Sequence, residues 1–137
     1  MPKVKTPARL ENLENLQKFI ASFARSNGFS EKRVLEIELT CEEAMVNIFS
    51  YAYLQGEDGD VEIDCNVDSK GDLIIGLVDS GRPFDPNEVP EPDINKEIPE
   101  RQIGGLGSLL IKKFADERIY RRLQNKNFLT FKFHKTD

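Results

Sequence analysis

The sequence contains few of the residues that mark zinc sites, disulfide frameworks or membrane spans. Its 137 residues include only 2 cysteines, Cys41 and Cys65, which lie far apart and within apolar patterns. We therefore predict neither a zinc site nor a disulfide framework, and we expect both thiols to be buried as small apolar side chains. No apolar run approaches the roughly 20 residues that a membrane span needs. A secretory signal would require an apolar stretch after residues 1–5, and there is none. We therefore expect a cytoplasmic protein that does not bind membranes.

Positive charge and histidine are scarce as well. The 19 Lys and Arg residues are outnumbered by 24 Asp and Glu residues, which gives a formal net charge of −5. An acidic chain is a poor candidate for direct nucleic-acid binding. The one histidine, His134, lies near the C-terminus in a predicted strand, and we expect it on the surface of an edge strand. The length is that of one domain with its own hydrophobic core, spanning residues 1–137.

Apolar residues recur at helical spacing in the first part of the chain. This periodicity predicts an amphipathic helix from about Ala8 to Ser26. Ser30 is a good N-cap and predicts the start of a second helix, which runs to about Tyr53. A third helix is predicted over residues 106–116. The segment 82–103 contains several prolines and shows no sustained periodicity, which is typical of a functional lid.

Strands are predicted after the second helix. Alternating polarity predicts a strand with one solvent-facing side over residues 61–67, and an apolar run predicts a buried strand over residues 73–78. These two strands are expected to form a hairpin. Residues 118–123 and 128–133 predict a second hairpin, with Asn125, Lys126 and Asn127 at its turn. Helices followed by antiparallel strands indicate an α+β fold, a two-layer sandwich.

The second predicted helix carries a narrow polar stripe on an otherwise apolar surface. The stripe consists of Glu36, Thr40, Glu43, Asn47 and Ser50. Glu43 and Asn47 are four residues apart, so their side chains are neighbours on one face. A carboxylate beside an amide oxygen suits Mg²⁺ or a polarised hydroxyl. From this helix alone, a solvent-exposed stripe on a buried helix is the simpler interpretation.

Two glycine motifs flank the predicted lid. Asp79-Ser80-Gly81 ends the buried strand. At such a position a carboxylate can contact a ligand, and the glycine lets the backbone approach that ligand closely. A plain turn is the alternative interpretation of this motif. Gly104-Gly105-Leu106-Gly107 opens the third predicted helix, whose free N–H groups form an anion site. No Gly-Lys-Ser/Thr follows, so this is not a Walker A motif. A flexible hinge for the lid is the alternative interpretation.

Taken in chain order, these signals are more specific than any one of them. Glu43-x-x-x-Asn47 on a helix, Asp79-x-Gly81 after a strand and Gly104–Gly107 before a helix resemble the GHKL ATPase superfamily. The local sequences are similar to those of the anti-sigma-factor serine kinases, and the resemblance extends from about Leu10 to the last strand. It implies the two-layer α/β sandwich of this superfamily (the Bergerat fold), with three main helices packed on a mainly antiparallel sheet. A histidine kinase is not expected, because the only histidine lies in the last predicted strand.

The resemblance also implies a role for each motif residue. Glu43 would be the general base on the attacking hydroxyl, and Asn47 would hold Mg²⁺ that bridges the phosphates of ATP. Asp79 would accept a hydrogen bond from the adenine amino group, and Gly81 would let the base lie against the backbone. The phosphates would lie against Gly104, Gly105, Leu106 and Gly107. Ser108 completes the expected nucleotide-binding set, although an apolar residue is more usual at this position in the family.

The implied function is that of a Mg-ATP-dependent serine/threonine kinase and anti-sigma regulatory factor. It would phosphorylate a small STAS-type antagonist protein and, once that antagonist is released, bind a sigma factor or another regulator. A homodimer is also expected. The alternative is a non-catalytic nucleotide-binding regulator that sequesters a protein partner, and an ATPase without a partner is a third option. The carboxylate of Glu43 favours the enzyme, because a pure binding module needs no base.

Overall fold

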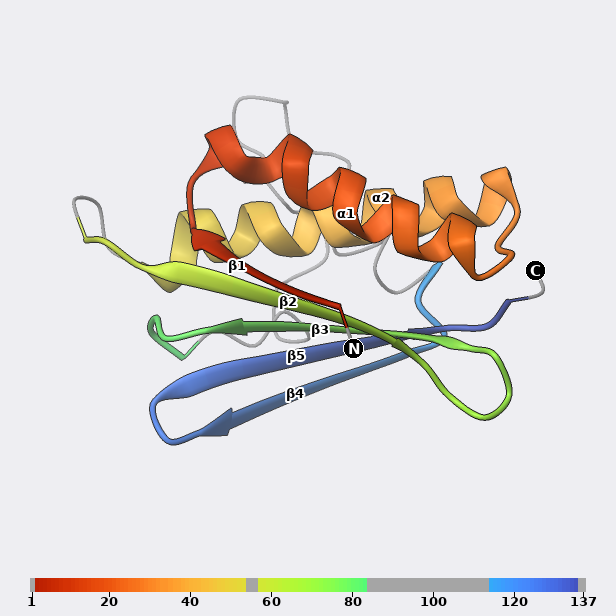
Figure 1. Ribbon diagram of the computed structural model, residues 1–137. Helices are drawn as coiled ribbons and strands as arrows, with labels where there is room; N and C mark the ends of the chain where they lie inside the picture. The colour runs from red at the N-terminus through yellow and green to blue at the C-terminus, as the bar shows by residue number, and fades with distance from the viewer. Residues whose placement is uncertain (1, 54–56, 84–113, 136–137) are drawn as a thin grey trace, which may run out of the picture.

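The computed structural model describes residues 2–53, 57–83 and 114–135, which form two layers. Two helices lie across one face of a five-stranded sheet of order β1-β2-β3-β5-β4, in which every neighbouring pair is antiparallel (Figure 1). The predicted α+β two-layer sandwich is therefore confirmed. The elements are β1 (Lys3–Pro7), the 3-10 turn η1 (Leu10–Asn12), α1 (Leu13–Ser26), α2 (Glu31–Asn47), the π-helical turn η2 (Ile48–Ala52), β2 (Asp60–Val67), β3 (Leu73–Asp79), β4 (Glu117–Leu123) and β5 (Lys126–Phe133).

The helix boundaries follow from local capping. Ser30 is the N-cap of α2, as predicted, and its Oγ accepts a hydrogen bond from the backbone N–H of Arg33 at 3.1 Å. The α-helical part of α2 ends at Asn47 rather than near Tyr53, because the chain continues as the π-helical turn η2. α1 begins at Leu13 rather than Ala8, because the residues before it form η1 and β1.

The first strand, β1, was not predicted from the sequence. β1 is short and pairs antiparallel with β2, with Lys3 opposite Asp64 and Pro7 opposite Asp60. Its Lys3 ammonium lies 3.5 Å from the carboxylate of Glu62. A five-residue segment with one aliphatic side chain, Val4, has too little periodicity to predict a strand, so its pairing with β2 decides its conformation.

The second hairpin is confirmed, but its turn lies earlier than predicted. Gln124 and Asn125 have left-handed φ values of 51° and 64°, and Leu123 pairs with Lys126. Two central residues with positive φ form the tight turn that matches the twist of antiparallel strands. Lys126 and Asn127 therefore belong to β5, and their predicted place in the turn is wrong.

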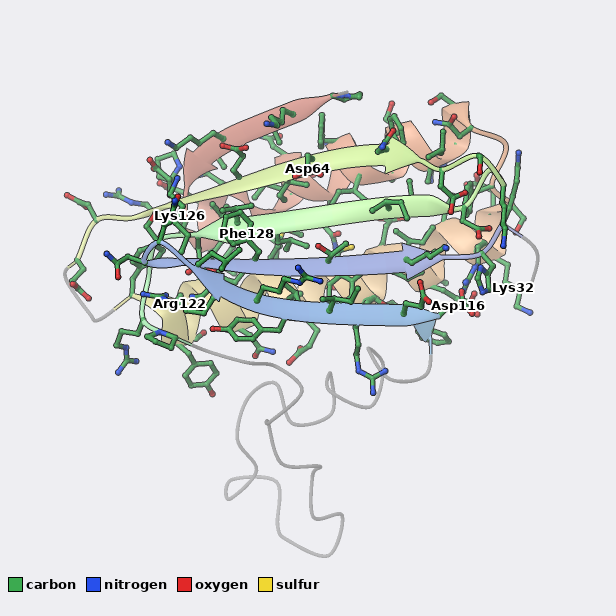
Figure 2. All side chains as sticks on the ribbon, turned by 90° about the horizontal axis from the view of Figure 1, so that it is seen from below. Lys32, Asp64, Asp116, Arg122, Lys126 and Phe128 are labelled. Carbon is green, nitrogen blue, oxygen red and sulfur yellow. The ribbon has the colours of Figure 1, made fainter. Side chains whose placement is uncertain are left out.

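The core lies between the helices and the sheet. Its largest fully buried side chains come from both layers and include Ile37, Met45, Leu77, Phe131 and Phe133. Cys41 and Cys65 are both free and buried in this core, as predicted. Burial, aided by the charge of Asp64, raises the pKa of the Cys65 thiol to about 12. The opposite face of the sheet is not covered by a helix in the described part of the chain, and Asp64 and Phe128 lie on it (Figure 2).

One buried arginine joins α2 to the chain on either side of the second hairpin. Arg33 is 5% exposed, and its guanidinium donates to the backbone oxygens of Phe114 and His134 and to the carboxylate of Asp116. A buried charge needs such partners, because an unpaired one is strongly destabilising. These contacts fix the N-terminal end of α2 at one end of the sheet.

Three predictions need correction or lie outside the described residues. His134 is half-exposed, as expected of a surface residue, but it follows the end of β5, which lies between β3 and β4 and is not an edge strand. The predicted third helix over residues 106–116 lies outside the described residues except at its end, where Phe114 is helical and Ala115 and Asp116 are not. The lid predicted over residues 82–103 also lies outside them, except for Arg82 and Pro83.

Candidate active site

The polar stripe of α2 is largely withdrawn from solvent between Thr40 and Asn47. Thr40 is 0% exposed and Asn47 is 3% exposed, whereas Ser50 beyond the end of the helix is exposed. Thr40 satisfies its hydroxyl by donating to the backbone oxygen of Glu36 at 2.9 Å. The simpler interpretation from sequence, a solvent-exposed stripe, is therefore wrong for the middle of α2. The residues predicted to act on ATP lie on the buried part of this stripe.

Two polar atoms of this stripe lack hydrogen-bond partners. Glu43 Oε1 and Asn47 Nδ2 are buried and make no hydrogen bond in the described part of the chain. Burial, followed by the charge of Glu42, raises the pKa of the Glu43 carboxyl, and the neighbouring Asn47 amide opposes this change. Buried polar atoms without partners are rare in folded proteins. Two of them on adjacent turns of α2 mark a place where a ligand would supply the missing contacts.

Asp79 lines the same crevice as Asn47, from the side of the sheet. It is the last residue of β3, it is 4% exposed, and its Oδ1 accepts hydrogen bonds from Gly81 N at 2.9 Å and Asn127 Nδ2 at 2.8 Å. Burial raises the pKa of Asp79, whereas the hydrogen bonds from Asn127 and Gly81 and the charge of Arg122 oppose this change. The carboxylate predicted to meet a ligand is thus held at the end of a buried strand.

Asn127 is a residue of this site that the sequence analysis missed. It pairs with Asp79 across the β3–β5 ladder, and it is 3% exposed. Alternation along β5 contained the necessary signal, because Asn127 lies two residues before the buried Leu129 and four before Phe131. Placing the turn too late in the chain removed Asn127 from this pattern.

Gly81 approaches the protein's own backbone closely. A Cβ added to Gly81 would lie 2.1 Å from the carbonyl oxygen of Ala52 in η2. The next residue, Arg82, donates its backbone N–H to the same oxygen at 2.6 Å. The packing of η2 against the end of β3 therefore requires a glycine here, apart from any contact with a nucleotide base, which stays a prediction.

Two of the predicted site residues, Asn47 and Asp79, meet at a crevice between α2 and the sheet, whereas Glu43 and Gly81 do not line it. It is lined by Ala44, Asn47, Ile48, Asp79, Tyr120, Asn127 and Leu129, and its volume is about 10 Å³. Apolar walls with a few convergent polar groups are typical of ligand sites. A volume of about 10 Å³ holds roughly one water molecule, so the crevice by itself is too small for a nucleotide base.

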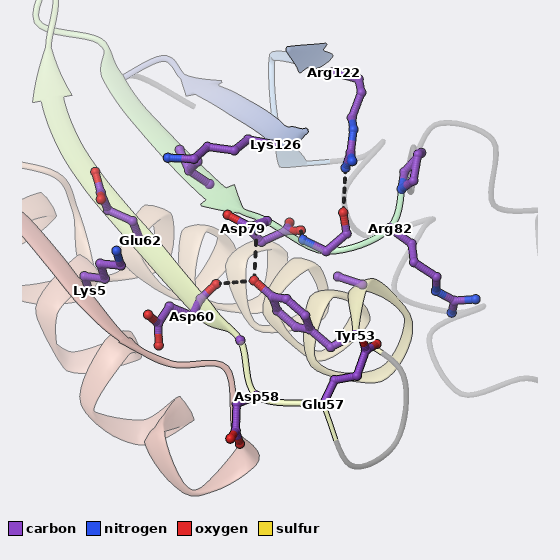
Figure 3. A pocket seen from close by; sticks show the side chains of 16 residues that line it. Lys5, Tyr53, Glu57, Asp58, Asp60, Glu62, Asp79, Arg82, Arg122 and Lys126 are labelled. Carbon is purple, nitrogen blue, oxygen red and sulfur yellow. Dashed lines mark hydrogen bonds between the residues drawn. The ribbon is translucent and has the colours of Figure 1, made fainter. Parts of the chain in front are cut away.

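A larger cavity of about 630 Å³ adjoins this crevice and shares Asp79 with it. Charged side chains of both signs surround it, among them Lys5, Asp60 and Arg122 (Figure 3). Tyr53 closes one side, because its hydroxyl donates to Asp60 O at 2.6 Å and accepts from Ser80 N at 3.0 Å. The cavity continues past the end of β3 and offers room beside the crevice, but Glu43 and Asn47 do not line it.

The oxygen ligands that Glu43 and Asn47 offer suit a metal–nucleotide complex better than a metal ion bound by protein alone. No cluster of three or more His, Cys, Asp or Glu side chains suited to a metal is found among the residues that the structure describes. Mg²⁺ usually takes only one or two protein oxygens and completes its shell with phosphates and water. The amide of Asn47 and the carboxylate of Glu43 suit that arrangement. The predicted phosphate-binding residues Gly104, Gly105, Leu106, Gly107 and Ser108 lie outside the described residues.

Comparison with protein families decides the family of this chain. The family described as the histidine kinase-like ATPase domain matches residues 6–133. The chain belongs to this ATPase family. Among curated proteins, serine/threonine-protein kinase BtrW of Bordetella bronchiseptica is 23% identical over 116 residues, which cover 85% of this chain and 81% of that protein. Serine-protein kinase RsbW of Oceanobacillus iheyensis is 24% identical over 120 residues, which cover 84% of this chain and 75% of that protein.

Solved structures place this ATPase domain in the expected fold. A crystal structure of the RsbU and RsbW domains of a Mycobacterium tuberculosis protein matches 98% of this chain with a TM-score of 0.65 and 11% identity. This chain covers 32% of that longer protein. The histidine kinase domain of a blue-light-activated kinase from Erythrobacter litoralis matches 90% of this chain and 61% of its own with a TM-score of 0.58 and 17% identity. At these identities the likeness shows the fold, and it confirms the predicted GHKL architecture.

Within the described residues of this ATPase domain, no helix is both long enough and apolar enough to cross a membrane.

Proposed function

We propose that this chain binds Mg-ATP at the α2–β3 crevice and transfers the γ-phosphate to a serine or threonine hydroxyl of a partner protein. The observation that carries the proposal is the pair of buried, unpartnered atoms Glu43 Oε1 and Asn47 Nδ2. The carboxylate of Asp79 lines the same crevice as Asn47. Family membership supports nucleotide binding, and the two curated relatives named as protein kinases support phosphoryl transfer.

Each residue has a chemical task in this proposal. Bound Mg²⁺ would supply charge neutralisation at the phosphates, and the side-chain oxygen of Asn47 would hold it. The Glu43 carboxylate would accept the proton of the attacking serine or threonine hydroxyl. At the same time the hydroxyl oxygen would bond to the γ-phosphorus, and the bond from that phosphorus to the ADP oxygen would break. Asp79 would accept a hydrogen bond from the adenine amino group. Gly104, Gly105, Leu106, Gly107 and Ser108 remain the proposed contacts of the phosphates.

The acceptor proposed here is a STAS-type antagonist protein. Its phosphorylation would release it and leave this chain free to bind a sigma factor or another regulator. Support comes from the relative named RsbW and from the similar solved structure, in which RsbU and RsbW domains occur in one protein. The proposal includes a homodimer, which light scattering of the purified protein tests directly.

Substitution of Glu43 tests the kinase reaction. We expect Glu43→Gln to reduce phosphate transfer to a STAS-domain protein from the same genome by about 100-fold or more, the range contributed by a general base. Mg-ATP binding should persist, because the amide keeps the size of the side chain. The assay follows radiolabel from γ-labelled ATP to the acceptor. Glu42→Gln is the matched control, since Glu42 is the exposed neighbour and should leave the rate unchanged.

The outcome also separates the kinase from its alternative. Undiminished transfer by Glu43→Gln would show that Glu43 is not the base. A second candidate, a regulator that sequesters a protein without transferring phosphate, is favoured by the exposed apolar side chains of β4, where Ile119 is 47% exposed and Leu123 is 56% exposed. It predicts partner binding that is independent of Glu43 and no labelled acceptor with any variant.

A further inference from the structure

The amide of Asn127 is fully occupied by hydrogen bonds. Its Nδ2 donates to Asp79 Oδ1 at 2.8 Å and to the backbone oxygen of Arg82 at 2.7 Å. Its Oδ1 accepts from the hydroxyl of Tyr120 at 2.5 Å and from Arg122 Nη1 at 3.2 Å. A primary amide offers two donor hydrogens and two acceptor positions, so all four are in use. The two sides of the amide are therefore distinct, because only Nδ2 can serve the two oxygens.

These contacts determine how Asp79 is presented. The two hydrogen bonds that the described residues donate to its carboxylate, from Gly81 N and Asn127 Nδ2, both end on Oδ1. Oδ2 receives no hydrogen bond from the residues that the structure describes. The carboxylate is thus anchored through one oxygen, and the other remains available as an acceptor. Asp79 and Asn127 line the crevice together with Asn47.

The backbone that follows Asp79 is fixed by the same group of side chains. Arg122 Nη1 donates to the backbone oxygen of Gly81 at 2.6 Å, while Asn127 holds that of Arg82. Figure 3 shows Arg122 reaching this turn from β4. Rotation of the Asp79 carboxylate would break hydrogen bonds from the turn and from β5. Arg122 of β4 in turn holds the two residues that donate them, Gly81 and Asn127. Such support by neighbouring side chains is what holds a recognition group in one geometry.

We propose that Asn127 is a positioning residue that fixes Asp79 as a hydrogen-bond acceptor toward the crevice and thereby sets a preference for adenine over guanine. This inference rests on the proposed binding of ATP. Adenine presents an amino donor where guanine presents a carbonyl oxygen, and a fixed carboxylate accepts from the first and repels the second. The Nδ2 donor of Asn127 holds only one oxygen of the Asp79 carboxylate. The discrimination between adenine and guanine therefore depends on Asn127.

The isosteric variant Asn127→Asp removes this donor while it keeps the size of the side chain. It places a second carboxylate against Asp79 and retains an acceptor for Tyr120 and Arg122. The matched control is Asn125→Asp, which makes the same chemical change at an exposed turn position two residues away. If Asn127→Asp does not fold, Asn127→Ser is measured in its place, because it removes the same donor without adding charge.

The measurement is the ratio of the dissociation constants for Mg-GTP and Mg-ATP, obtained by calorimetry. We expect the parent protein and Asn125→Asp to prefer ATP equally, and Asn127→Asp to lose about tenfold of that preference, the effect of one hydrogen bond to a charged group. A merely structural role would weaken both nucleotides to the same degree. An equal loss for both, or an unchanged ratio, would overturn the assignment.

A second measurement needs no nucleotide. In the free protein, the side-chain NH₂ protons of Asn127 should exchange slowly with solvent, and their NMR resonances should move on Asp79→Asn but not on Ser80→Ala. Exchange as fast as that of Asn125 would overturn the inference even if ATP binds. Absence of Mg-ATP binding would overturn both the proposed function and the adenine preference, whereas the NMR result alone would still decide whether Asn127 holds Asp79.

Discussion

At the scale of single residues, Glu43 combines a functional position with an unfavourable environment. Its Oε1 is buried without a hydrogen-bond partner in the described part of the chain, and burial raises the pKa of its carboxyl above the ordinary value of 4.5. Natural proteins accept such strain at sites that need a reactive group. The same properties that suit Glu43 to act as a base therefore reduce the stability of the free protein.

The stability of the free protein should consequently increase in Glu43→Gln. Because the pKa is higher in the folded state, the folded protein binds this proton more tightly than the unfolded chain. The stability of the parent protein therefore decreases as the pH rises from 4.5 through the raised pKa, and the neutral amide escapes this loss. We expect a gain of about 1 kcal/mol at pH ~8, comparable with the penalty of one poorly satisfied buried group, and a smaller gain at pH ~5.

Urea denaturation at both pH values measures this effect, without nucleotide or metal present. Glu42→Gln is again the comparison. It removes only the contribution of the Glu42 charge to the raised pKa of Glu43, so the larger part of the pH dependence, which comes from burial, should remain. A loss of stability in Glu43→Gln that is the same at both pH values would contradict the account of a strained carboxylate.

At the scale of elements, the site depends on the contact between the end of β3 and η2. Gly81 lies against Ala52, and Tyr53 joins the start of β2 to the residue after β3 through hydrogen bonds to Asp60 and Ser80. The π-helical turn thus carries the chain directly from Asn47 to the neighbourhood of Asp79. Any displacement of η2 would change the distance between these two sides of the crevice.

Gly81→Ala should therefore destabilise the protein and weaken nucleotide binding together. The added methyl group would lie 2.1 Å from the Ala52 oxygen, so η2 or the end of β3 must move. We expect a loss of about 2–3 kcal/mol, which is typical of overpacking. Gly71→Ala is the comparison, because Gly71 has a φ of +86° but no atom within 4 Å of the added Cβ. It should lose only about 1 kcal/mol of stability through backbone strain. Equal losses in thermal or urea unfolding would contradict the packing argument.

At the scale of the whole molecule, the sequence predicted the layers better than the pairing. Periodicity identified α1 and β2, because the side chains of each element repeat with the period of its own backbone. The N-cap Ser30 identified the start of α2, and an apolar run identified β3. β1 was missed because its pairing with β2, rather than its composition, makes it a strand. Asn127 was misplaced because the position of a turn fixes strand register, and a small shift moves a residue from the buried face into a loop.

Only those site residues that belong to short sequence motifs could be predicted from the sequence. Glu43, Asn47 and Asp79 belong to short motifs, and the structure brings Asn47 and Asp79 to one crevice. The contacts of Asn127 with Asp79 and of Gly81 with Ala52 join segments that are far apart in the sequence, so no local pattern announces them. The glycine motif of residues 104–107 lies outside the described residues, and its role stays a prediction.

We propose that α2 and β3 form a Mg-ATP site, and calorimetric titration of the purified protein with Mg-ATP tests this proposal most directly. We predict saturable binding that Asn47→Ala weakens by about tenfold or more, as expected when a ligand to a charged group is removed. Asn66→Ala, at an exposed position of β2, should bind as the parent protein does. No binding at millimolar Mg-ATP, or equal binding by Asn47→Ala, would contradict the site assigned here.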